Sequence, residues 1–518
     1  MFGLSVHLTV TTRGGEMLPL EQFLHDKQIV AVVCNQWGDT GKGKFVDLFS
    51  LWADMIIRGT GGANAGHTII VNGTKLVLHL IPSGIMHDIR GKINVIGRGV
   101  AFDPQIFVIE LADIRKIGIT TEFLRVSHEA PLMLPYHLLQ DRVSAASKGI
   151  GTTGRGIGPL YSDFAARRTL PVNDLLNPDL FRSKIQAYAE EQARYFKVLT
   201  KKERTAAEEV LAHQHLHGGV YWHPKKIIDP KAVVDVYLDE FAPIMRAYIA
   251  NTEELVRQAQ VAGKRLLLEG AQGHLLSILY GTTFYQTSSD PSIEGLAQGC
   301  HLKLGDVDYV LGVVKAPAMT RVGAGPFPSE LGGKQSEEYC ASGLTAADES
   351  SQYPNPHDLL NDDDEFKQSI GLRMVSGEYG ATTGRTRRVG WLDLVAMRYS
   401  MKTNGPRVAL TKFDVLTGVK KIKLCVSYTY RGKEYQLAEN LLQDGKIVND
   451  FSRFSEVLCE CRPNFIEFDG WEEDISQILN YDDLPHQVRV IIDFIEQFTG
   501  CNVDIVSVGP DRNQTIIR

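Results

Sequence analysis

The chain has 518 residues, of which 43% are hydrophobic and 23% are charged, as in an ordinary globular protein with a sizeable core. Its formal net charge of −7 gives no support for binding to nucleic acid or to a membrane surface. The 7 cysteines are dispersed, and no apolar run reaches the length of a membrane span. Thr11, Thr12 and Arg13 interrupt the apolar N-terminal residues, so we expect no signal peptide. These features together predict a protein of the reducing cytosol.

An extension at residues 1–26 precedes the first of six apolar runs that predict buried strands. The runs cover residues 29–34, 55–57, 266–268, 309–315, 408–411 and 503–508. Helically spaced apolar residues lie between several of them, and the last such helix is expected to end at Gly500. Asn72-Gly73 predicts a β-hairpin. This alternation predicts an α/β fold with a large, mostly parallel central sheet flanked by helices, and with small subdomains.

Two polar segments are predicted to be inserted into residues 27–518, which otherwise form a single domain. The insert near 195–230 holds four histidines, which we interpret as surface residues because no acidic or thiol partner is close in sequence: His213, His215, His217 and His223. The insert near 332–376 holds an acidic run at 362–365, which is typical of a solvated loop. We also interpret Cys459 and Cys461 as surface thiols.

A glycine-rich turn follows the predicted strand at 29–34. It reads Asp39-Thr40-Gly41-Lys42-Gly43-Lys44, and a helical pattern comes directly after it. Glycines let backbone N–H groups approach an anion, and a helix N-terminus adds a favourable dipole. Asp39 stands where a carboxylate could hold a metal or take a proton. The spacing and the hydroxyl of a Walker A motif are absent, so this turn alone is compatible with either phosphate binding or a purely structural role.

Three further loops carry side chains suited to phosphate or carboxylate ligands. The loop at 61–68 places His67 among glycines just after a strand, where it can donate a hydrogen bond to charge developing on an oxygen. The loop at 151–159 combines two hydroxyls with Arg155, which suits a phosphate. The loop at 380–388 joins hydroxyls to three arginines, whose guanidinium groups match carboxylates.

Lys412 and Asp414 follow the predicted strand at 408–411. An aspartate there can accept hydrogen bonds from N1–H and the 2-amino group of guanine, and the lysine stem can pack on the ring. Adenine lacks both donors. Beside three loops of phosphate-binding character, the pair indicates GTP rather than ATP.

Together these motifs resemble those of adenylosuccinate synthetases, from about residue 27 to 518. The most specific pieces are Gln36-Trp37-Gly38-Asp39, Asn64-Ala65-Gly66-His67-Thr68 and Glu269-Gly270-Ala271-Gln272-Gly273, with 152–159, 320–323, 381–385, 390–393 and 509–512. The resemblance implies GTP-dependent ligation of L-aspartate to IMP through a 6-phosphoryl-IMP intermediate. The products are adenylosuccinate, GDP and phosphate, in the first committed step of AMP synthesis.

The resemblance also implies a role for each matching residue. Asp39 would take the N1 proton of IMP, His67 would steady the transferring phosphoryl group, and Gln272 would contact the base. Mg²⁺ would be held by Asp39 and the carbonyl of Gly66. GTP would be bound by Gly38, Gly41, Lys42, Gly43, Lys44, Lys412, Asp414, Ser507 and Gly509, IMP by Asn64, Thr153, Arg167, Gln272 and Thr287, and aspartate by Thr382, Thr383, Arg385 and Arg387. Arg167 matches an arginine that reaches the neighbouring subunit, which implies a homodimer.

The chain departs from the family pattern near the expected base. Thr40 stands where the family usually has Glu, Ala63 replaces a commonly polar residue, and Asp290-Pro291-Ser292 replaces Asn-Thr-Thr. Two alternatives therefore stay open. One is a ligase for another purine nucleotide such as dGMP, but phage relatives of that kind lack the aspartate that Asp39 represents. The other is a non-catalytic purine-nucleotide-binding protein, which Thr40 favours.

Overall fold

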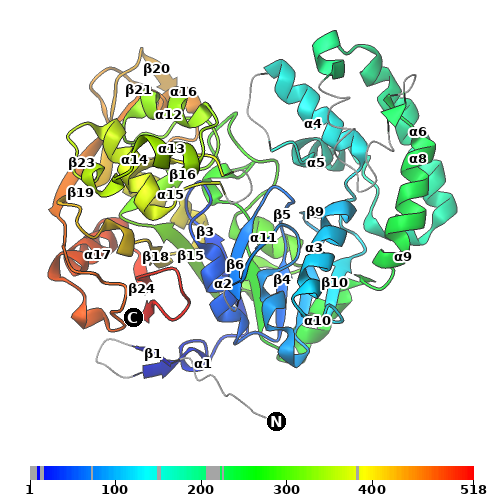
Figure 1. The fold of residues 1–518 in the computed structure, drawn as a ribbon, viewed down its shortest axis with the longest axis horizontal. Helices are drawn as coiled ribbons and strands as arrows, with labels where there is room; N and C mark the ends of the chain where they lie inside the picture. Colours follow the sequence, from blue (N-terminus) through cyan, green and yellow to red (C-terminus); the bar gives the residue numbers. More distant parts are fainter. Residues whose placement is uncertain are drawn as a thin grey trace.

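The computed structural model describes residues 9–11, 17–71, 74–148, 153–205, 222–223, 227–380 and 384–518. Within these ranges a ten-stranded sheet forms the centre of the molecule (Figure 1). Its strands, in spatial order, are β13 (Ile249–Ala250), β10 (Leu124–Ser127), β8 (Ile93–Ile96), β4 (Met55–Arg58), β14 (Leu266–Glu269), β3 (Ile29–Cys34), β15 (Tyr309–Lys315), β18 (Arg407–Thr411), β24 (Asn502–Ser507) and β25 (Thr515–Ile517). Neighbouring strands are parallel except β24 and β25, which are antiparallel. The expected large, mostly parallel sheet is confirmed.

All six predicted strands are present. β3 and β15 have the expected bounds, β4, β14 and β18 differ from them by one residue at one end, and β24 is shifted by one residue at both ends. The sequence did not reveal β8, β10, β13 or β25, which have two to four residues each. Such short segments carry too few apolar residues to show a period, and their neighbours in the sheet define them instead.

Helices cover both faces of the sheet. Val30 and Val32 of β3 pack into a core with α2 (Lys42–Ser50), whereas Ala31 and Val33 face the core that holds α10 (Thr252–Val261) and α11 (Ile293–Gly299). All six residues of β3 are buried. A strand that is covered on both faces must be apolar throughout, which is why this run was visible in the sequence.

Helices near both ends of the chain also belong to this fold. Leu20 in α1 (Leu20–Phe23) is buried in the same core as α2, and the ring of Phe23 lies 5.7 Å from that of Tyr309. The predicted helix near the C-terminus is α17 (His486–Thr499), which ends at Gly500 with φ 74° as expected. No helix in the described ranges is long and apolar enough to cross a membrane.

The predicted hairpin pairs β6 (His67–Val71) with β7 (Thr74–Leu78) in antiparallel register, Val71 opposite Thr74. Its turn residues, Asn72 and Gly73, lie outside the described residues.

The two polar segments differ in what the structure describes of them. Of the histidines near 195–230, His213, His215 and His217 lie outside the described residues, and His223 lies in β11 (Trp222–His223). The segment 332–376 folds into α12 (Gly333–Ala341), α13 (Ala346–Gln352) and α14 (Glu365–Ser376). Arg373 and Glu349 form a buried ion pair of 2.7 Å between α14 and α13.

Two smaller predictions concern the acidic run at 362–365 and the cysteines at 459 and 461. The acidic run leads into α14, where the carboxylate of Asp364 accepts from the Phe366 N–H at 2.9 Å. The surface-thiol interpretation is right for Cys459, which is exposed, and wrong for Cys461, which is buried at the start of β23 (Cys461–Asp469). An inward-facing strand position decides the burial of Cys461.

Candidate active site

Asp39 lies in a tight turn between β3 and α2. Gly38, Asp39 and Gly41 all have positive φ, at 87°, 56° and 84°, a region that a non-glycine residue rarely adopts. Oδ2 of Asp39 forms an ion pair of 2.9 Å with Nε of Arg387.

Charge controls the protonation of this carboxyl. Burial acts to raise the pKa of Asp39, but the charges of four cations outweigh it and hold the pKa below its ordinary value of 3.8. The cations are Arg387, Lys315, Lys42 and Lys412. Asp39 is therefore ionised near neutral pH.

These four side chains, which we call the cationic cluster, come from separate elements. Lys42 Nζ donates to the carbonyl of Gln272 at 2.6 Å, and burial lowers its pKa. Lys315 Nζ donates to Thr320 Oγ1 at 3.0 Å and to Glu378 at 2.5 Å, and Lys412 Nζ lies 3.5 Å from the same carboxylate. Sequence reasoning assigned no role to Lys315 or Glu378, because neither stands in a recognisable loop motif. The cluster gives an anionic ligand a concentrated positive field.

His67 lies at the start of β6 against the end of β14. Its Nδ1 hydrogen-bonds to Oε1 of Glu269, whose other oxygen accepts from the Ser83 N–H at 2.8 Å. Burial lowers the pKa of His67, and Glu269 opposes that shift. The motif at 269–273 contains Glu269, but the sequence indicates no role for this residue. The carboxylate fixes the ring orientation and leaves Nε2 for another partner.

Two amide side chains carry buried polar atoms that lack a partner. Oε1 of Gln272 accepts from Ser289 Oγ at 2.8 Å, whereas its Nε2 has no hydrogen-bond partner within the described ranges. Oδ1 of Asn64 is also buried and has no hydrogen-bond partner within the described ranges. Buried amide groups are normally paired. These two atoms fit a ligand with both acceptors and donors, such as the base and ribose of a nucleotide.

The expected guanine and GTP residues gather where β18 and β24 end. Lys44 Nζ donates to Ser507 Oγ at 2.6 Å and to the carbonyls of Gly509 and Gln514, both at 2.8 Å. Burial raises the pKa of Asp414, against the charges of Lys412 and Lys44. The turn at Asp39 is joined to this region by Thr411, whose Oγ1 donates to the carbonyl of Thr40 at 3.0 Å.

The remaining residues that we expect to bind IMP lie in separate segments of the chain. Thr287 is half-buried, and its N–H donates to the carbonyl of Leu276 at 2.7 Å. Thr153 and Arg167 are exposed, on either side of α5 (Ile157–Ala165). Tyr161 of α5 donates to the carbonyl of Gly99 at 2.6 Å, which holds the helix beside the loop of Asn64.

The residues expected to bind the substrate aspartate are described only in part. Thr382 and Thr383 lie outside the described residues. The carbonyl of Arg385 accepts from the Gly380 N–H at 2.7 Å, which closes the base of this loop. Gly66, the expected carbonyl ligand of the metal, is half-buried and precedes His67 directly.

Comparison with known proteins gives one consistent result. Residues 31–516 match the family model described as adenylosuccinate synthetase. Two relatives with that name come from Thermoanaerobacter sp. (strain X514), 38% identical over 492 residues covering 94% of this chain and 98% of the relative, and from Shouchella clausii (strain KSM-K16), 39% identical over 490 residues covering 94% and 97%. A solved structure of the fully ligated adenylosuccinate synthetase from Plasmodium falciparum superposes with a TM-score of 0.74 at 29% identity, covering 95% of this chain and 100% of that one. The chain therefore belongs to the adenylosuccinate synthetase family.

Proposed function

We propose that Asp39, His67 and Gln272 carry the reaction of this family in the present chain. The protein is a ligase that joins L-aspartate to IMP with GTP. The assignment of residues is supported above all by Asp39, which is ionised beside the N-terminus of α2 and faces the cationic cluster. A general base next to a site for phosphate is what phosphoryl transfer to a nucleobase needs.

The first step activates the base of IMP. The Asp39 carboxylate accepts the N1 proton, and the electron pair moves onto O6, which attacks the γ-phosphorus of GTP and displaces GDP. An amide-like oxygen is a poor leaving group, and phosphorylation makes it a good one. The amine of aspartate then forms the bond to C6, phosphate leaves, and the amine loses a proton to give adenylosuccinate.

His67 and the lysines act on the charge that develops during this transfer. With Nδ1 held by Glu269, the ring presents Nε2 to the phosphoryl group. The negative charge of the phosphates favours the protonated ring, which donates from Nε2. Lys42 supplies a second positive charge at the start of α2.

We propose Mg²⁺ as the metal of this site. An ionised carboxylate at Asp39 and a backbone carbonyl at Gly66 are oxygen ligands of the kind that Mg²⁺ prefers, so the residues present fit the ion. When bound, it neutralises charge on the phosphates of GTP.

The remaining residues are assigned to the binding of GTP, IMP and aspartate. Asp414 and Lys412 recognise guanine, and Gly38, Gly41, Gly43, Lys44, Ser507 and Gly509 complete the GTP site. Asn64, Thr153, Gln272 and Thr287 hold IMP, and Thr382, Thr383, Arg385 and Arg387 hold the carboxylates of aspartate. Arg167 reaches the IMP of a neighbouring subunit, so we propose a homodimer. We place the protein in the cytoplasm, with residues 27–518 as one catalytic domain.

One assay tests the function. The protein is incubated with IMP, GTP, Mg²⁺ and L-aspartate, and adenylosuccinate is followed by ultraviolet absorbance. Product formation is expected. Turnover only with dGMP in place of IMP would assign the chain to a different ligase, and tight nucleotide binding without product would assign it a non-catalytic role.

A further inference from the structure

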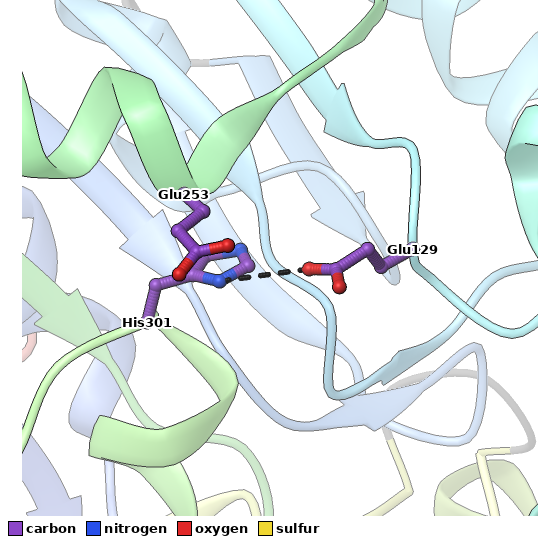
Figure 2. A group of neighbouring side chains, drawn as sticks. All are labelled: Glu129, Glu253 and His301. Carbon is purple, nitrogen blue, oxygen red and sulfur yellow. Dashed lines mark ion pairs between the residues drawn. The ribbon is translucent and has the colours of Figure 1, made fainter.

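A second group of ionisable side chains lies at the edge of the sheet, away from the catalytic residues. Glu129 follows β10, Glu253 lies in the first turn of α10, and His301 follows α11. One ligand atom from each of the three lies within 4.8 Å of the other two. Figure 2 shows the side chains converging from these three segments. Strands β8, β4 and β14 separate β10 from β3 and its Asp39 turn.

The imidazole of His301 is the buried member of this group. Its side chain is only 1% exposed, and Nε2 lies 2.8 Å from Oγ1 of Thr252. Nδ1 has no hydrogen-bond partner within the described ranges, since the nearest carboxylate oxygen, Oε2 of Glu129, is 3.7 Å away. Buried polar atoms are normally paired, so a buried ring nitrogen that faces carboxylates without a hydrogen bond is available to bind a ligand.

The backbone supports the same conclusion. His301 has φ 62°, a left-handed conformation that non-glycine residues rarely adopt and that is often kept for a functional reason.

We propose that Glu129, Glu253 and His301 bind a Zn²⁺ ion. One imidazole nitrogen and two carboxylate oxygens are ligands that Zn²⁺ accepts, with water in the fourth position. Tetrahedral bonds of about 2.1 Å put ligand atoms roughly 3.4 Å apart. Both glutamates are exposed at their side chains and can close in around the ion. The ion would tie together the segments that follow β10 and α11 and the start of α10.

The test uses full-length protein stripped of metal, titrated with Zn²⁺ by calorimetry near neutral pH. Glu253→Gln is expected to weaken the tightest binding at least tenfold, because even a lost outer partner of a ligand costs about 10- to 100-fold. Glu254→Gln is the matched control. Glu254 is the next residue of the same helical turn, and Arg257 holds its carboxylate at 2.6 Å. This control should bind Zn²⁺ like the unmodified protein.

His301→Asn, which tolerates the same backbone conformation, should also abolish the tight site. Crystals soaked in Zn²⁺ should show anomalous density between the three side chains, which separates this site from uptake by His213, His215 and His217. Equal Zn²⁺ affinity in Glu253→Gln and Glu254→Gln, or anomalous density only elsewhere, would overturn the proposal. The normal fold of each variant is checked by its thermal unfolding without metal.

Discussion

At the scale of single residues, the partners of Asp39 come from distant parts of the chain. The adjacent Thr40 carries no charge and is buried, and its Oγ1 has no partner in the described ranges. Its carbonyl instead accepts from Thr411. The pKa of Asp39 is held low by Arg387 and three lysines, against the effect of burial. Asp39 is therefore ionised without a glutamate at position 40, where the family usually has one.

Replacing Asp39 by Asn tests the base directly. The amide cannot accept the N1 proton, so we expect kcat to fall by at least about 10²- to 10⁴-fold, the usual contribution of a general base. Binding of GTP measured without Mg²⁺ should stay within a few-fold, because Lys42, Lys44 and Asp414 are unchanged. Steady-state kinetics and a GTP titration measure the two effects.

Asp113→Asn serves as the control for that variant, since Asp113 pairs with Lys116 at 2.9 Å on the surface of α3 (Pro104–Lys116). It should retain normal turnover. Activity in Asp39→Asn comparable to that control would remove Asp39 from the role of base.

The carboxylate of Asp414 is expected to set the preference for guanine. Asp414→Asn should reduce the preference for GTP over ATP by roughly 10- to 100-fold, which corresponds to one or two hydrogen bonds to a charged group. Competition binding with the two nucleotides measures the ratio. An unchanged ratio would exclude this contact.

The titration of Asp414 gives a second measurement of the same contact. Burial raises its pKa above the ordinary 3.8, so on acidification it takes up a proton earlier than an exposed aspartate. Only the ionised form accepts from guanine, and GTP affinity should therefore fall as the pH is lowered through the raised pKa. Asp414→Asn should lack this part of the pH dependence, and parallel profiles for the two proteins would contradict the assignment.

At the scale of elements, β14, β6 and the 3₁₀ helix η1 (Ser83–Arg90) meet at Glu269. The fully buried carboxylate accepts from Ser83 Oγ and its N–H, both at 2.8 Å, and from the ring of His67. One side chain thus joins β14 to two elements that lie much earlier in the chain, with separations of 186 and 202 residues between the bonded pairs. We assign Glu269 a positioning role, because it acts on the reaction through His67.

Glu269→Gln keeps the shape of this side chain and removes its charge. We expect kcat to fall by about 10-fold or more with little change in the KM for GTP, as for partners that orient a catalytic histidine. Glu269 raises the pKa of His67, so its loss lowers that pKa, and the alkaline side of the kcat profile should move to lower pH. Ser83→Ala, which keeps the charge, should leave the profile in place. A fall in kcat without this shift would indicate a merely structural role.

At the scale of the whole molecule, Arg167 is exposed on the surface beyond α5. Its neighbour Arg168 pairs within the chain, with Asp163 and with Glu191. An arginine that completes the site of a second subunit would have to lie on the surface in this way.

A mixture of two defective proteins tests that assembly. Arg167→Ala and Asp39→Asn should each be nearly inactive, but mixed dimers should contain one complete site. Random exchange should then restore roughly a quarter of normal activity, since half of the dimers are mixed. The control variant Arg168→Ala should be active without being mixed with a second protein. A mixture that stays as inactive as its components would refute a shared site.

The sequence by itself determined the strands with both faces buried, the glycine turns and the family. β3 and β15 were visible because burial on two faces requires unbroken apolar runs. The loops after β3 and β4 were visible because glycines cluster there beside polar or charged side chains, which is typical of anion-binding turns. Only the tertiary structure decided the short strands β8, β10, β13 and β25 and the partners of the site residues. Lys315 acts on Asp39 and Glu269 acts on His67 through space, and electrostatic interaction depends on distance, which separation along the chain does not report.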